Sequence, residues 1–174
     1  TVAWTFEGTD YTMNFDSDYI VCGGGWDSEV ESTSVTMTGG TVNFGVFGGG
    51  ATADAKVTGN VSVNIIDGTL ITGVVGGGIC GAVDGDITMV IGSESTQPVI
   101  GNASDGNIIG GGFNEGADVG GNINVTVNDV KMINTPSNSK IVVGGGVWAN
   151  VEGDVSFIVN GGELDGHLAG GNLG

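Results

Sequence analysis

The chain has 174 residues, of which 39% are hydrophobic, 37 are glycine and 2 are proline, so both disorder and a collagen-like helix are excluded. Its 20 acidic residues face only 3 basic ones, for a net charge of −17, and without a basic cluster nucleic acid is excluded as a partner. No hydrophobic run approaches the ~20 residues of a membrane span, so we expect no membrane insertion.

The N-terminal segment is rich in aromatic residues, with 6 of the 11 in the first 26 positions. Apolar residues alternate with polar ones at Trp4 and Phe6 and again at Tyr11, Met13 and Phe15, which predicts short strands. We expect residues 1–19 to be capping strands that plug the first coil of the following repeat. A platform of aromatic rings for sugars is the alternative. The six aromatic residues are Trp4, Phe6, Tyr11, Phe15, Tyr19 and Trp26.

Glycine triplets then recur along residues 20–174, each preceded by two mostly apolar residues. They begin at Gly23, Gly48, Gly76, Gly110 and Gly144, with a truncated sixth at Gly170, at intervals of 25, 28, 34, 34 and 26 residues. A period of this size is typical of solenoids, in which each repeat stacks on the next.

Between the triplets, two further strands are predicted in each repeat. Val61, Val63 and Ile65 alternate with polar residues, and the same pattern returns from Ile87, Ile123 and Val155. A third, shorter strand follows a glycine turn. The fold class is therefore all-β: a three-sided parallel β-helix of about five coils with an aromatic-rich N-terminal cap. We expect the glycines to supply positive φ at the corners and to let the coils approach closely.

A polar residue follows the equivalent glycine in four repeats. These residues are Asn60, Asp86, Asn122 and Asp154. We predict that they stack as a ladder of amide hydrogen bonds in which alternation of Asn with Asp separates like charges.

The two cysteines, Cys22 and Cys80, are placed about two coils apart by the same register. Strand spacing then separates them by ~9.6 Å along the axis. This exceeds the ~7 Å limit between the Cα atoms of a disulfide. Both are expected to be free thiols.

Two repeats are longer than the others, and in both the extra residues precede the next triplet. We expect these insertions to leave one corner of adjacent coils and to lie side by side, as recognition loops of solenoids do. Loop variation without function is an equally open interpretation. The candidate recognition residues are Glu94, Gln97, Asn102, Asp105, Asn134, Asn138 and Lys140.

The triplets and the Gly-Asn or Gly-Asp pairs at Gly59, Gly85, Gly121 and Gly153 resemble the glycine-triplet β-helix repeats of large bacterial surface proteins, the adhesin-like or autotransporter-passenger-like kind. The resemblance implies a secreted or cell-surface protein with a structural or adhesive role, and a glycan or protein of a host or cell surface as partner. The sequence stops in mid-motif after Gly170. From this we expect either a fragment of a longer solenoid or a subunit that stacks end to end into filaments.

An enzymatic function and a metal-binding function are the alternatives to this interpretation. Polysaccharide-cleaving β-helices are the main rival, because Asp84 and Asp86 flank one glycine and Glu152 and Asp154 flank another. These pairs recur at the repeat period, as solvated positions do, and His167 is the single histidine. We therefore expect no catalytic residues, no enzyme and no cofactor. Ca²⁺ stays an open alternative because acidic residues gather along one corner.

Overall fold

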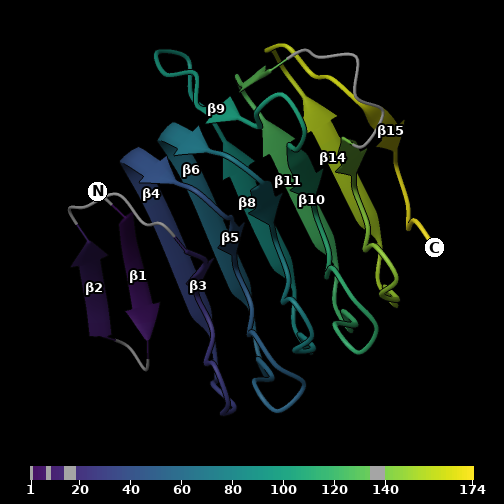
Figure 1. Cartoon of the computed structure of the whole chain (residues 1–174). Coiled ribbons are helices and arrows are strands. Elements are labelled where there is room, and N and C mark those ends of the chain that lie inside the picture. The colour runs from purple at the N-terminus through teal and green to yellow at the C-terminus, as the bar shows by residue number, and fades with distance from the viewer. Residues whose placement is uncertain (1, 7–8, 14–18, 134–139) are drawn as a thin grey trace.

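The computed structural model describes residues 2–6, 9–13, 19–133 and 140–174, with side chains from residue 19 onward. The chain winds into an all-β parallel solenoid of about five coils (Figure 1). One side is the main sheet, and a narrower second sheet lies behind it. The main sheet contains β4 (Thr33–Val42), β6 (Val61–Leu70), β8 (Ile87–Ile91), β9 (Val99–Ile100), β11 (Ile123–Val127), β12 (Lys131–Met132) and β14 (Val155–Val159).

The second sheet has six strands, in spatial order β3 (Val21–Cys22), β5 (Val46–Phe47), β7 (Gly73–Val75), β10 (Asn107–Ile109), β13 (Ile141–Val143) and β15 (His167–Ala169). The first five of these strands begin coils 1 to 5, and β15 follows coil 5. Neighbouring strands pair in parallel, each with the equivalent strand of the next coil. A third ladder of single bridges joins one valine per coil at the corner between the sheets: Val30, Val57, Val83, Val119 and Val151.

The register of the main sheet brings equivalent repeat positions into contact. Val61 pairs with Ile87, Ile87 with Ile123, and Ile123 with Val155. Val61, Ile87 and Ile123 are buried, and β-branched side chains pack well on a pleated surface. Full burial of each such side chain contributes about 1.5–3 kcal/mol. The predicted solenoid and its inward ladder are thus confirmed.

The glycine triplets are needed for close approach between coils. A Cβ on Gly76 would overlap the carbonyl oxygen of Gly110 and the Cγ2 atom of Ile87 across the core. The middle glycines stack directly, and the N–H of Gly77 donates to the Gly111 oxygen at 2.9 Å. Positive φ occurs at glycines outside the triplets, such as Gly68 within β6. The triplets are glycine because the solenoid is thin there, with no room for a side chain.

The N-terminal strands extend the main sheet sideways. β1 (Val2–Phe6) pairs antiparallel with both β2 (Thr9–Met13) and β4, so the outer edge of β4 is covered. The side chains of residues 1–18 lie outside those described, and so does the predicted plug that they would form. Tyr19 and Trp26 are 79% and 66% exposed, so these two rings do not fill the first coil. The described part of the chain contains no helix that could span a membrane.

Candidate functional site: an aromatic groove on the second sheet

The second sheet carries apolar side chains on both faces. Along each short strand, one residue points into the core and the next points out, so Val46 belongs to the central cluster while Phe47 belongs to a separate outer cluster. Val75 and Ile109 continue the outer column. These outward side chains are nevertheless buried, because residues of the turns that follow the triplets, such as Phe113, pack over them.

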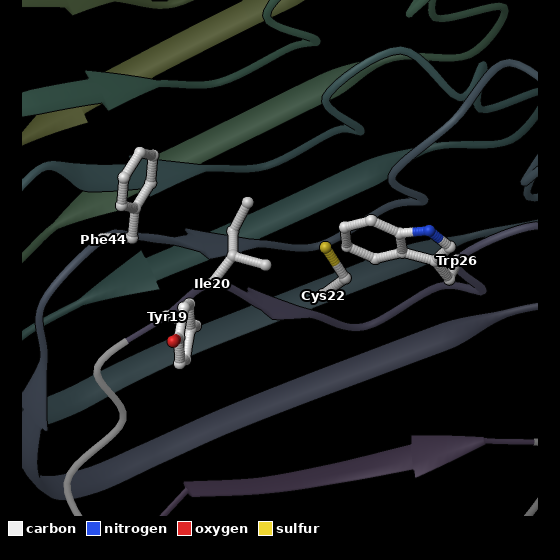
Figure 2. Close-up of a pocket in the computed structure, with 5 residues that line it drawn as sticks. All are labelled: Tyr19, Ile20, Cys22, Trp26 and Phe44. Atoms are coloured by element: carbon white, nitrogen blue, oxygen red, sulfur yellow. The ribbon is translucent and has the colours of Figure 1, made fainter.

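A hollow of about 500 Å³ opens on this face at coil 1. Of the described residues, Tyr19, Ile20, Cys22, Trp26 and Phe44 line it, and none of them carries a charge at neutral pH. Figure 2 shows the Cys22 sulfur near the Trp26 ring, with Phe44 across Ile20 from them. Burial raises the pKa of the Cys22 thiol to about 11, so this thiol stays protonated at neutral pH.

Two further hollows continue this surface along the solenoid axis. Phe44 also lines a hollow of about 160 Å³ that reaches Phe113 in coil 4. The Phe113 ring lies 6.2 Å from the Trp148 ring, centroid to centroid, at an interplanar angle of 55°. Trp148 in turn lines a third hollow, of about 240 Å³, together with Glu115. We call this surface the aromatic groove and define it by Tyr19, Trp26, Phe44, Phe113 and Trp148.

Trp148 holds a backbone conformation that is unfavourable for its residue type. Its φ is 56°, and among the described residues it is the single non-glycine with positive φ. Such a conformation costs a bulky residue on the order of 1–3 kcal/mol, and strain of this kind is common at functional sites. The Trp148 N–H donates to the Leu173 oxygen at 2.8 Å, which helps to hold the turn, and the side chain is 61% exposed. The strained turn therefore presents an indole ring to solvent.

The four residues of the predicted ladder lie in register at one corner. The Oδ1 atom of Asn60 accepts a hydrogen bond from the N–H of Asp86, and the Oδ1 atom of Asp86 accepts one from the N–H of Asn122. Asn122 accepts from the N–H of Asp154 in the same way. The acceptor oxygens bind backbone N–H groups of the next coil, a pattern that Asn and Asp side chains can both supply.

The candidate recognition loops are divided between two corners. The extra residues of coil 3 lie partly between β8 and β9, at 92–98, and partly between β9 and β10, at 101–106; those of coil 4 lie between β12 and β13. Glu94 is exposed, and the Gln97 Nε2 atom donates to Asp129 Oδ1 of coil 4 at 2.8 Å. Asn102 Oδ1 accepts from the N–H groups of Ser104 and Asp105 within its own turn.

The remaining candidates in the second loop are not accessible or not described. Asn134 and Asn138 lie outside the described residues. Lys140 is fully buried, and its Nζ atom lies 3.1 Å from Asp165 Oδ2. Its ammonium group is thus directed into the solenoid rather than toward a ligand in solvent.

Asp84 and Asp86, one of the two carboxylate pairs considered for hydrolysis, have other partners. Asp84 Oδ2 lies 2.8 Å from the Lys56 ammonium, and this hydrogen bond raises the pKa of Lys56. Asp86 belongs to the ladder. Among the described residues there is no group of three or more His, Cys, Asp or Glu side chains that could hold a metal ion.

Sequence reasoning missed the aromatic groove, although part of its signal is visible in the repeat. Trp26 and Phe113 each directly follow a glycine triplet, and Trp148 lies two residues beyond one. Tyr19 and Phe44 each lie four residues before the first glycine of a triplet. Comparison of this chain with protein-family models, curated proteins and solved structures finds no match.

Proposed function

We propose that this chain is a non-catalytic structural and adhesive segment of a secreted or cell-surface bacterial protein. The observation that carries the proposal is the aromatic groove, in which four exposed rings and the half-buried ring of Phe113 lie along a ladder of parallel strands. Monomeric proteins seldom expose contiguous apolar patches of this kind unless the patch binds a partner. Solenoids provide such extended surfaces because each coil repeats the same attachment point at a constant spacing.

The structural part of the proposal is supported by the open edge at coil 5. Val127 is fully buried in coil 4, whereas its neighbour Val159 on β14 is 45% exposed, and Leu168 on β15 is 62% exposed. A Cβ on Gly170 would have no neighbour within 4 Å, although the equivalent glycines of earlier coils leave no space for one. An edge of this shape accepts another glycine-triplet coil.

End-to-end stacking of two copies is restricted at the opposite edge. Because β1 pairs with β4, the main sheet of a second copy meets the N-terminal hairpin rather than the first coil. A filament of copies would therefore join through the second sheet at β3, or would require the hairpin to move.

Polysaccharide binding is the second candidate for the adhesive function. It is favoured by the flat, exposed rings of Tyr19, Trp26 and Trp148, which combine an apolar face with a polar group. A polysaccharide-cleaving version would need two carboxylates across the scissile bond. Of the described residues that line the three hollows, Glu115 is the single carboxylate.

Adhesion can be tested with beads coated with the full chain and incubated with intact cells. We expect the double substitution Trp26→Ser and Phe44→Ser to abolish adhesion, because it removes two exposed rings without opening a core cavity. The matched control is Ser62→Ala with Thr88→Ala on the exposed face of the main sheet, which should leave adhesion unchanged. Equal adhesion by the groove variant and the control would rule out the groove as the adhesive surface.

A further inference from the structure

Carboxylates lie near both ends of the aromatic groove. They are on turns that follow the glycine triplets, among them the turns that carry Trp26 and Phe113. At one end, Asp27 directly follows Trp26. At the other, Glu115 and Trp148 line one hollow. The acidic residues of these turns are Asp27, Glu29, Asp54, Glu115 and Asp118.

The two ends of the groove differ in chemistry. The hollow at coil 1 is lined by rings and aliphatic side chains and suits a bulky apolar group. The hollow at coil 5 combines the exposed Trp148 indole with the Glu115 carboxylate and the amides of Asn150 and Asn172. An indole face beside a carboxylate attracts a guanidinium or ammonium group through a cation–π contact and an ion pair together.

The distance between the two ends of the groove follows from the number of coils between them. Trp26 belongs to the turn of coil 1 and Trp148 to the turn of coil 5, four coils further along. With ~4.8 Å between stacked strands, the two rings are separated by about 19 Å along the axis. An extended polypeptide spans this distance in about six residues.

We propose, building on the adhesive function above, that the aromatic groove binds an extended, cationic polypeptide segment of a partner protein. A bulky apolar side chain of the segment fills the hollow formed by Tyr19, Trp26 and Phe44. A lysine or arginine about six residues away lies on Trp148 beside Glu115. The segment runs along the solenoid axis and crosses all five coils.

Charge favours a cationic polypeptide over a second copy of this chain and over an anionic polymer as the occupant of the groove. A second copy of the chain also carries −17, and of its three lysines Lys140 is buried and Lys56 is paired with Asp84, so it offers little positive charge. Anionic polymers are repelled by the same net charge. An uncharged saccharide would contact the rings and donate hydroxyl hydrogen bonds to Glu115, but it would gain no ion pair there.

The test uses ten-residue synthetic peptides with Ser and Thr as background. The first peptide has a Trp and an Arg six residues apart, the second has Glu in place of Arg, and the third has the Arg two residues from the Trp. Calorimetric titration of the full chain should give the tightest binding for the first peptide. We expect affinities about tenfold weaker for the Glu peptide and about threefold weaker for the short spacing. The advantage of Arg over Glu should shrink in 0.5 M salt.

Two matched variants identify the cationic hollow. Glu115→Gln and Glu163→Gln each remove one exposed carboxylate, the first inside the groove and the second at the bridge to Lys131, outside the three hollows. Glu115→Gln should weaken binding of the first peptide about threefold, and Glu163→Gln should not change it. Trp148→Gly should weaken binding about fivefold while leaving the fold at least as stable, because glycine tolerates positive φ.

Equal effects of Glu115→Gln and Glu163→Gln, or equal affinity for the first and second peptides, would overturn the inference. Absence of peptide binding together with Trp26-dependent binding to neutral polysaccharides would also overturn it, yet would leave the adhesive function intact. Failure of the proposed adhesive function is detected separately by the bead experiment. In that case, beads coated with the groove variant would adhere to cells as strongly as beads coated with the wild-type chain.

Discussion

The Oδ1 atom of Asn122 accepts a hydrogen bond from the backbone N–H of Asp154, one coil further along, at 2.9 Å. Asn122 itself donates its N–H to Asp86 in the preceding coil at 2.7 Å. Asn122 thus lies between two carboxylates in a column with ~4.8 Å spacing.

Asn122→Asp keeps the acceptor oxygen but places three carboxylates in succession. We expect the free energy of unfolding to fall by about 1 kcal/mol at low ionic strength and neutral pH. The loss should diminish in high salt, which screens exposed charges. Asn124→Asp is the control, because it adds the same charge two residues further along, in β11, between the uncharged Thr88 and Ser156. Equal melting temperatures for the two variants would argue against charge separation in the ladder.

The glycine triplets allow a second comparison. Gly76→Ala should destabilise the solenoid by at least about 3 kcal/mol, since the new Cβ has no space between Gly110 and Ile87. Gly170→Ala, at the equivalent position of the open edge, should leave the monomer's stability within about 0.5 kcal/mol. Denaturant unfolding measures both variants. If Gly170→Ala instead disrupts association in light scattering, a coil of another copy stacks on this edge.

The ion pair between the buried Lys140 ammonium and the part-exposed Asp165 carboxylate gives a third prediction. Asp165→Asn leaves the Lys140 ammonium buried without its carboxylate, and we expect a loss of about 3 kcal/mol in stability. Lys140→Met removes the charge and keeps the volume, so it should cost clearly less. Thermal unfolding shows which of the two variants loses more stability. A larger loss of stability for Lys140→Met than for Asp165→Asn would contradict this account.

Cys22 gives a prediction for alkaline pH. Its thiol is free, and burial raises its pKa from 9.0 to about 11. Below pH 9 the thiol is protonated in both the folded and the unfolded state. Between pH 9 and 11 only the unfolded state loses the proton, so the free energy of unfolding should fall, by up to about 2 kcal/mol.

The contribution of Cys22 is isolated by comparison with Cys22→Ala, because tyrosines and lysines also titrate in this range. The wild-type protein should lose more stability between pH 9 and 11 than the variant does. Alkylation of Cys22 by iodoacetamide should likewise begin about two pH units later in the folded protein than in urea. Parallel pH curves for wild type and variant would show that the thiol is not desolvated.

The sequence by itself determined the solenoid and its interior. Residues one repeat apart, such as Val61 and Ile87, had to meet because parallel coils stack equivalent positions through continuous hydrogen-bonded ladders. The same register placed Cys22 and Cys80 in different coils, and both are free thiols. Local alternation and a fixed period were sufficient for these conclusions.

Only the tertiary structure decided what lies on the surface. Tyr19 and Phe44 share one repeat position and Trp148 occupies another, and the three residues form one groove because the corners fold over the outer face of the second sheet. Lys140 looks like a loop residue in the sequence, but its side chain is buried against Asp165. The path of a corner depends on contacts between distant segments rather than on the repeat period, so the interior was predictable and the groove was not.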